Sequence, residues 1–250
     1  MKLPLISIIM PCYNSAEYIT ESIESVLEQT YQEFEVIVCD DCSTDKTVQV
    51  VRDLAKQDNR IQLLQMHSNQ GPAAARNYAL DCVRGDKIAF LDSDDLWHSN
   101  FLEEQLQFMS ATKAQAVFSS YRRVGADRSS VLSDFIVPAR VSYNDILKSN
   151  SIPCLTVVID RSAVGDERMP NVGIEDLGFW LNLLKRIDFF YGNPAVLADY
   201  RLREGSRSSS KLALIKPQWD SYRKGQNLSI LSSAYYLAHW AINGVLKYRK

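Results

Sequence analysis

The first ninety residues alternate between apolar runs and amphipathic stretches. Four runs of apolar, often β-branched residues have the length of a buried strand: residues 5–11, 34–41, 60–66 and 87–92. In the stretches that follow the first three runs, 14–30, 43–57 and 71–85, apolar residues recur at helical spacing. Buried strands that alternate with helices predict a mostly parallel sheet covered by helices on both faces. The pattern therefore predicts an α/β fold.

Two helix ends carry local signals. Asn14 or Ser15 is expected to cap the first helix, because a side-chain oxygen there can accept a backbone N–H of the first turn. Gly85 stands where the third helix is expected to close, and glycine is common just past a helix C-terminus.

The alternation becomes less regular after a further predicted helix at 101–109. Strands are expected at 116–124, 154–160, 189–192 and 195–202. Helices are expected at 143–149, at 175–187 and over much of the chain after residue 211. There is no internal repeat and no low-complexity linker, and the most polar breaks are 125–130 and 203–211.

Polar residues gather where three of the predicted parallel strands end. These ends lie at the same edge of the sheet, where ligands of such folds bind. The residues are Pro11, Cys12, Tyr13 and Asn14 after the first strand, Asp40 and Asp41 after the second, and Asp92, Ser93, Asp94 and Asp95 after the fourth.

Three carboxylates within four positions need a neutralising partner. Clustered acids are costly unless a cation offsets their charge, and Mg²⁺ or a similar hard ion takes carboxylate and phosphate oxygens together. We therefore expect Asp94 and its neighbours to hold a metal that bridges to a diphosphate. The alternative is that one aspartate caps the following helix and the others are solvated.

The second strand end and Tyr13 suit a nucleoside. A carboxylate of Asp40 or Asp41 can accept hydrogen bonds from a base N–H or a ribose hydroxyl. Tyr13 can offer an aromatic face to the base, although packing at a strand end explains it equally well.

Composition narrows the class of protein. The 250 residues are 46% hydrophobic and 23% charged, with a formal net charge of -2, which gives no reason to expect nucleic-acid binding. No apolar run reaches the roughly 18 residues of a spanning helix. The five cysteines follow no metal-site spacing, and the acidic pair inside Cys39-x-x-Cys42 would raise a thiol pKa. We expect reduced cysteines and a cytoplasmic protein.

Four motifs in register resemble family 2 glycosyltransferases: ISIIMPCYN, VIVCDDCSTDKT, NQGPAAARNYAL and GDKIAFLDSDD. GIEDLGFWLNLLKR and DYRLREGSRSSSK are similar to two later motifs of the family. The resemblance implies the GT-A fold, a Rossmann-like mostly parallel sheet flanked by helices. It also implies inverting transfer from a nucleotide-sugar donor, commonly in bacterial surface-polysaccharide synthesis and often onto a lipid-linked glycan.

The resemblance assigns donor contacts to the first three motifs. Pro11 and Tyr13 match positions that line the base and the ribose. Asp41 matches an aspartate that bonds the uracil edge, with Asp40 beside it. Arg76 matches an arginine that helps to hold the nucleotide or its diphosphate. A UDP-sugar is therefore the expected donor.

Asp92 and Asp94 match the two acids of the family's metal-binding motif. Asp94 is the expected direct ligand of Mn²⁺ or Mg²⁺, and Asp92 is expected at the metal and at the ribose or sugar. Ser93, which lies between them, is expected to line the donor site, and Asp95 is expected to contact the donor sugar. Asp176 matches the catalytic base, although an acid in the first turn of a helix also has a purely structural explanation.

The chain departs from the family pattern at Arg203, where relatives commonly carry histidine. A guanidinium can clamp a diphosphate but cannot bind a metal. Arg203 is therefore expected at the diphosphate, and metal dependence is open on this ground.

The resemblance also divides the chain. Residues 1–98 form the expected nucleotide-sugar half and 99–210 the acceptor half of a domain 1–210, followed by a helical extension 211–250. The extension mixes apolar, aromatic and basic residues. It is expected either to lie on the anionic inner face of the cytoplasmic membrane or to pack on the domain or on another subunit.

Other functions fit less well. A nucleotidyltransferase usually has a glycine-rich, basic loop after the first strand, which PCYNSAEY is not. A non-catalytic nucleotide-sugar-binding protein needs no base such as Asp176. A dehydrogenase would carry a G-x-G-x-x-G after the first strand, and none is present there.

Overall fold

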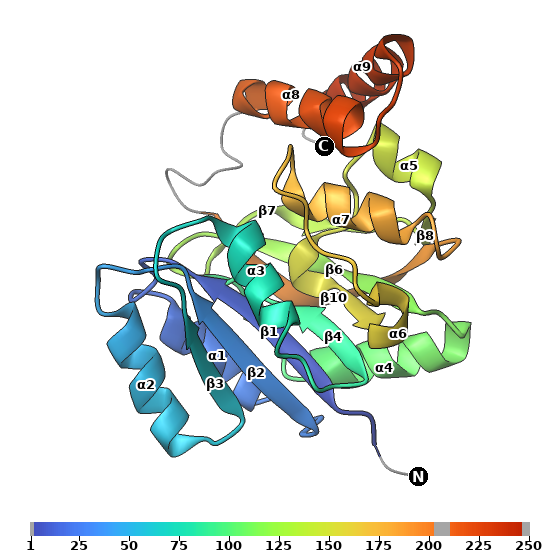
Figure 1. Ribbon diagram of the computed structural model, residues 1–250. Coiled ribbons are helices and arrows are strands. Elements are labelled where there is room, and N and C mark those ends of the chain that lie inside the picture. The colour runs from blue at the N-terminus through green and yellow to red at the C-terminus, as the bar shows by residue number, and fades with distance from the viewer. Residues whose placement is uncertain (1–2, 203–210, 247–250) are drawn as a thin grey trace.

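The computed structural model describes residues 3–202 and 211–246. Within them one sheet has the strand order β3-β2-β1-β4-β9-β6-β10-β5, with β7 paired to β6 and β8 to β10 (Figure 1). The strands are β1 (Ile6–Cys12), β2 (Phe34–Asp40), β3 (Ile61–Gln65), β4 (Lys87–Phe90), β5 (Leu96–Trp97), β6 (Ala116–Val124), β7 (Ser130–Phe135), β8 (Arg140–Val141), β9 (Val158–Asp160) and β10 (Phe190–Arg201).

The first four strands form the parallel half of the sheet. β2 pairs with β1 and β3, and β1 pairs with β4, all in parallel. β9 is antiparallel to both β4 and β6, and β10 is parallel to β6. Two reversals across β9 restore the direction, so the carboxyl ends of β1, β2, β4, β6 and β10 lie at one edge.

Helices cover both faces of the sheet, and each face has its own apolar core. One core includes residues of α3 (Pro72–Leu80), α5 (Tyr143–Lys148), α6 (Arg161–Val164) and α7 (Glu175–Leu183). The other includes residues of α1 (Ile19–Leu27), α2 (Thr47–Gln57) and α4 (Phe101–Thr112). Strand residues alternate between the two, with Ile9 in the first core and Ile8 in the second. This is the mixed α/β fold that the sequence predicted.

Several local expectations were wrong. α1 begins at Ile19 without a side-chain cap, because the amide oxygen of Asn14 instead accepts the Thr44 N–H at 2.8 Å and the Asp45 N–H at 3.3 Å. Ser15 donates its hydroxyl to the Tyr13 carbonyl. The two strands expected at 189–192 and 195–202 form the single strand β10, which is irregular between Asn193 and Ala198.

Gly85 does not close a helix. α3 ends at Leu80, and Gly85 lies where the backbone passes close to the start of β1. A Cβ there would come within 2.7 Å of the Leu5 carbonyl oxygen and the Ser7 nitrogen. Glycine is needed for this close approach of two backbone segments.

The chain after residue 211 forms a helical hairpin that packs on the domain. The hairpin comprises α8 (Lys211–Asp220), a π-helical turn (Ser221–Gly225) and α9 (Ile230–Leu246), drawn in red in Figure 1. The Tyr222 hydroxyl donates to the Leu147 carbonyl of α5 at 2.6 Å, and the Gln226 amide donates to Asn182 of α7 at 3.0 Å. No helix among the described residues is both long and apolar enough to cross a membrane.

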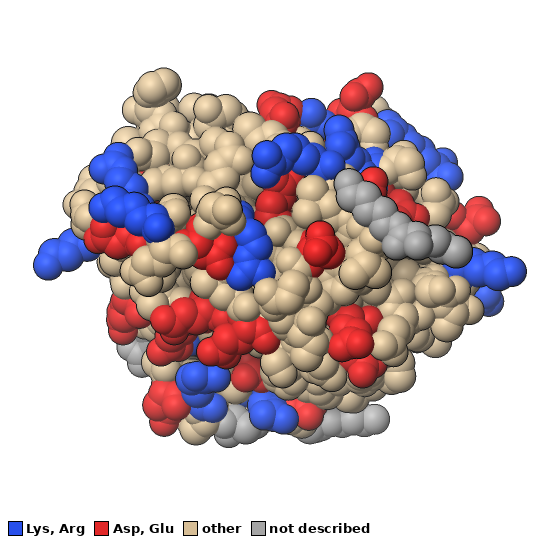
Figure 2. All heavy atoms as spheres, turned by 90° about the horizontal axis from the view of Figure 1, so that it is seen from below, with Lys and Arg blue, Asp and Glu red and all other residues tan. Residues whose placement is uncertain are grey.

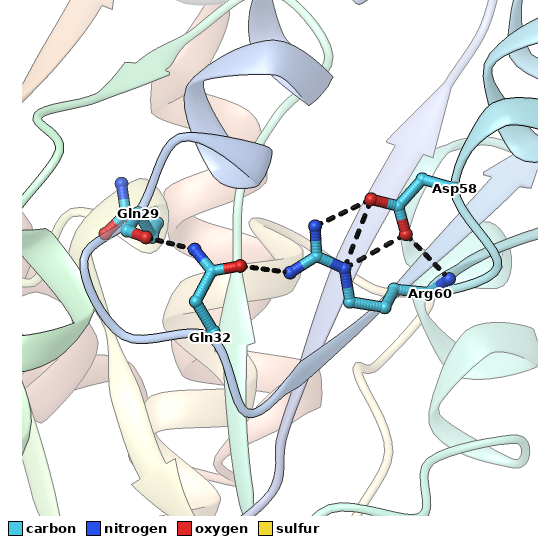
Figure 3. Close-up of polar contacts among 4 residues, drawn as sticks. All are labelled: Gln29, Gln32, Asp58 and Arg60. Carbon is cyan, nitrogen blue, oxygen red and sulfur yellow. Dashed lines mark hydrogen bonds and ion pairs between the residues drawn. The ribbon is translucent and has the colours of Figure 1, made fainter.

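A polar chain ties together the loops near the opposite ends of the parallel strands (Figure 3). Arg60, just before β3, pairs with Asp58 at 2.6 Å and donates to Gln32 at 2.7 Å, and Gln32 donates to the Gln29 carbonyl. The Arg60 guanidinium also lies 4.3 Å from the ring centroid of Phe34, the first residue of β2. This bonding holds the α1–β2 and α2–β3 loops together.

We expect Gly85→Ala to lower the free energy of unfolding by about 1–3 kcal/mol, because the added methyl group overpacks against backbone. Urea denaturation measures the change. Gly244→Ala is the matched control, since a Cβ there meets nothing within 4 Å. It should be neutral or stabilising by up to about 1 kcal/mol, as alanine favours helix. Equal midpoints for the two variants would contradict the close approach.

Candidate active site

The residue that follows β2, Asp41, is hydrogen-bonded to the loop that precedes α3. Asp41 is 3% exposed, and its two carboxylate oxygens accept the backbone N–H groups of Gln70 at 2.8 Å and Gly71 at 2.7 Å. Asp40 is 1% exposed and accepts the Ser43 N–H at 3.0 Å. Both aspartates therefore shape loops of the carboxyl edge, and Asp41 fixes the start of α3.

The end of β1 presents one exposed aromatic side chain. Pro11 is buried within β1, whereas Tyr13 is 48% exposed. An exposed ring beside buried carboxylates at a sheet edge is suited to stacking on a planar group.

Cys39, the first cysteine of the Cys39-x-x-Cys42 pair, lies near the end of β2. All five cysteines of the chain are described and free. Burial raises the pKa of Cys39 to about 12, and the charges of Asp41 and Asp40 add to the rise. A Cys39 thiol with so high a pKa stays protonated at neutral pH.

The acidic segment after β4 is held from several sides. Asp92 accepts a hydrogen bond from Arg76 at 2.5 Å, and its side chain is about a third exposed. The Ser93 hydroxyl donates to the Ser15 hydroxyl at 2.8 Å. Asp95 is 1% exposed and accepts the Arg201 backbone N–H at 2.8 Å. Asp94 lies between them and is partly exposed.

Arg76 joins three elements through its guanidinium. It projects from α3, is 5% exposed, and pairs with Asp92 after β4 and, at 3.7 Å, with Glu175 at the start of α7. Burial by itself lowers the pKa of Arg76, but the neighbouring carboxylates outweigh it and raise the pKa above its usual value. Arg76 is therefore a permanent cation within an acidic cluster.

Asp176 is the perturbed acid of this cluster. Burial, and then the charge of Glu175, raise the pKa of Asp176 to about 6, while Arg76 and the Leu177 N–H, donated at 2.7 Å, oppose the rise. Cys154 borders the same cluster, and burial raises the pKa of its thiol far above the usual value. A carboxylate with a pKa near 6 is suited to accept a proton at neutral pH.

The structure places the site residues of the first half and Asp176 at one edge, as Figure 1 shows for the elements that carry them. Arg203 lies outside the described residues.

Two further anchors were not foreseen from the sequence. The Asn77 amide donates to the Met169 carbonyl at 2.9 Å and accepts the Met169 N–H at 2.8 Å, which ties the loop before α7 to α3. Arg201 pairs with Glu21 of α1 at 2.6 Å and lies 4.8 Å from the ring centroid of Tyr18. Both join residues more than ninety positions apart, and no local sequence pattern marks such pairs.

The acids after β4 fit a divalent metal only if the substrate completes its coordination. Among the described residues, no group of three or more His, Cys, Asp or Glu side chains is placed to hold a metal ion. Asp94 and Asp92 are both partly exposed, and Mg²⁺ or Mn²⁺ commonly takes one or two carboxylates together with water and substrate phosphates. The donor set therefore suits a metal shared with a diphosphate.

Comparison with known proteins gives one consistent class. The profile of the family described as Glycosyl transferase family 2 matches residues 7–155. Two curated relatives, each 39% identical over 245 residues and 98% of this chain, are TuaG of Bacillus subtilis, named a teichuronic acid biosynthesis glycosyltransferase, and WfgD of Escherichia coli, a UDP-Glc:α-D-GlcNAc-diphosphoundecaprenol β-1,3-glucosyltransferase. The alignments cover 97% of TuaG and 95% of WfgD.

A solved structure shares the fold. The crystal structure of S. aureus TarS 1–349 in complex with UDP-GlcNAc superposes with a TM-score of 0.75 at 25% identity, over 94% of this chain and 71% of TarS. The chain therefore belongs to glycosyl transferase family 2. It is a glycosyltransferase with the GT-A fold.

We expect Asp176→Asn to stabilise the protein at high pH. Because the folded-state pKa, about 6, exceeds the ordinary 3.8, the stability that the neutral carboxyl contributes is complete below pH 3.8 and is lost as pH rises through 6. The neutral amide avoids this loss. In urea denaturation at pH 8, the free energy of unfolding of the variant should therefore exceed that of the wild type by on the order of 1–2 kcal/mol. At pH 4 the two proteins should differ little. The exposed Asp166→Asn is the control. An equal pH dependence for both variants would contradict the raised pKa of Asp176.

Proposed function

We propose that this glycosyltransferase moves a sugar, with inversion, from a UDP-sugar to a hydroxyl of a lipid-linked glycan during bacterial surface-polysaccharide synthesis. TarS, which has the same fold, was crystallised with UDP-GlcNAc. WfgD is named for a UDP-Glc donor and a diphosphoundecaprenol-linked acceptor. TuaG is named for teichuronic acid, a surface polymer. In this protein the single supporting observation is the half-buried Asp176, which has a raised pKa and lies with Arg76 and Asp92.

The donor nucleoside binds across the ends of β1 and β2. The exposed ring of Tyr13 stacks on the base, with Pro11 beneath it, and Asp40 and Asp41 face the base edge and ribose. Each oxygen of Asp41 accepts one backbone N–H. A carboxylate oxygen has a second lone pair, so Asp41 can hold its loop and accept a base N–H as well.

The diphosphate lies at the segment after β4. Asp94, with Asp92, would hold Mn²⁺ or Mg²⁺, and an ion bound there would supply positive charge for the diphosphate leaving group. Ser93 and Asp95 line the donor sugar. Arg76 contributes a fixed positive charge beside Asp92. We assign Arg203 to the diphosphate as well, by its place in the family motif.

Asp176 is the base. As the acceptor oxygen forms its bond to the anomeric carbon, the bond from that carbon to the diphosphate oxygen breaks with both electrons leaving on the diphosphate. The acceptor hydroxyl gives its proton to the Asp176 carboxylate. A base near its optimal pKa typically contributes about 10²–10⁴-fold to such a step.

Two variants separate donor binding from proton transfer. We expect Asp176→Asn to bind UDP normally in calorimetry with Mn²⁺ but to lose about 10²–10⁴-fold in kcat. Asp94→Ala should lose the metal-dependent part of UDP binding, because it removes a carboxylate from the ion. Near-normal turnover by Asp176→Asn would show that Asp176 is not the catalytic base. If UDP binds equally well with and without metal, and equally well to Asp94→Ala, the diphosphate is held by Arg76 and Arg203 and not by a metal at Asp94.

We further propose that the enzyme works on the inner face of the cytoplasmic membrane, with α9 in contact with lipid. Leu231, Tyr235 and Ile242 recur at helical spacing and are 83%, 53% and 57% exposed. Lys216 and Lys224, on α8 and the π-helical turn, have exposed side chains and share one carboxylate, Asp220, so together the three residues carry a net positive charge. Apolar residues with nearby lysines suit an anionic bilayer surface. The face opposite this hairpin, in Figure 2, shows acidic and basic side chains interspersed.

Flotation with phosphatidylglycerol vesicles tests this contact. The double variant Leu231→Glu/Ile242→Glu should float at least fivefold less than the wild type, because it places two charges in the apolar face. Val131→Glu/Ile136→Glu is the matched control, since both residues are exposed but belong to β7 and the loop after it. Equal flotation of all three proteins would refute the contact.

A further inference from the structure

The C-terminal hairpin touches the chain immediately before the proposed base. The Ile174 N–H donates to the Ser221 hydroxyl oxygen at 2.9 Å. Ile174 is the residue before α7, whose first two residues are Glu175 and Asp176. Its side chain forms no helix cap, so Ser221 supplies a hydrogen bond at the helix start from a segment 47 residues away.

Gly173 shows how close this contact is. Its φ of +75° is a conformation that favours glycine. A Cβ at Gly173 would overlap the Ser221 hydroxyl and come within 2.7 Å of the Ser221 nitrogen and 2.8 Å of the Pro217 carbonyl oxygen. The backbone before α7 therefore lies directly against the backbone of the hairpin, with no room for a side chain between them.

Ser221 is itself held firmly. It is 1% exposed, and its hydroxyl donates to the Pro217 carbonyl at 3.1 Å while accepting from Ile174. It is the first residue of the π-helical turn, a rare form that often marks functional sites. Around it, Tyr222 is fully buried and bonds to the Leu147 carbonyl, and Gln226 bonds to Asn182. The turn is thus fixed on α5 and α7.

We infer that Ser221 is a positioning residue for the reaction: by holding Ile174 it fixes where α7 begins and so where the Asp176 carboxylate meets the acceptor hydroxyl. The inference rests on the proposed role of Asp176 as the base. The start of α7 is bonded on the other side to α3, through Asn77 and Arg76. The base is therefore held between the nucleotide half of the domain and the hairpin.

The test compares two buried serines of the hairpin in the 250-residue chain. Ser221→Ala removes the acceptor of the Ile174 N–H. Ser233→Ala, the matched control, removes a fully buried hydroxyl of α9 that has no hydrogen-bond partner. Calorimetry with UDP gives Kd and the number of folded sites, to which kcat is normalised. Hydrogen exchange measures the amides of the peptide spanning residues 172–178.

Ser221→Ala should lower kcat by about 10- to 100-fold, because a base displaced by even 1 Å can cost that much. The KM for the donor and the Kd for UDP should change less than twofold, and exchange of the 172–178 peptide should speed up at least tenfold. Ser233→Ala should match the wild type in all of these. If stability alone were affected, the number of folded sites would fall while kcat per site stayed constant.

Wild-type kcat and exchange in Ser221→Ala would overturn the inference, and so would equal losses in both serine variants. Asp176→Asn, assayed in parallel, separates this inference from the proposed base. Loss of transfer in Asp176→Asn together with a wild-type Ser221→Ala would refute only the positioning role. Retained transfer in Asp176→Asn would refute the base itself, whatever Ser221→Ala does.

Discussion

The buried guanidinium of Arg76 is the interaction on which the site depends. Asp92, Glu175 and Asp176 come from two elements that would repel each other if these acids met without a cation. An arginine stays charged even when buried, and its planar fork can serve two carboxylates at once. Arg76 therefore permits the end of β4 and the start of α7 to approach, while burial and then the charge of Glu175 still raise the pKa of Asp176.

The parallel half of the fold could be predicted from the sequence because its signals are local. Continuous apolar runs and helical spacing mark β1 to β4 and the helices between them, and the order of parallel strands brings their carboxyl ends together. Asp92, Asp94 and Asp40 could be placed at one edge on this basis alone. The assignment of Asp176 needed the family resemblance, because an acid in the first turn of a helix is common for structural reasons.

The remainder depends on contacts that no local pattern records. β5 and β8 have two residues each, too few for any periodicity, and exist because they pair with β10. Asn14 has the chemistry of a helix cap but bonds a neighbouring loop. The bonds of Asn77 to Met169 and of Ser221 to Ile174 cross long stretches of chain.

These long-range bonds change how the division of the chain is understood. The split into a nucleotide half, an acceptor half and a helical extension follows sequence motifs, and it remains a prediction as a description of folding units. Physically, the segment that carries Asp176, the proposed base, is held by contacts from all three parts. Arg76 holds Glu175 from the first, α7 lies in the second, and Ser221 holds Ile174 from the third. The hairpin contacts Ile174, two residues before the proposed base Asp176. If the hairpin also faces lipid, as proposed, the lipid-contacting surface and the Asp176 carboxylate are parts of one connected unit. An enzyme that meets a lipid-linked substrate at a surface benefits from this arrangement, because the base is then positioned relative to the membrane as well as to the donor.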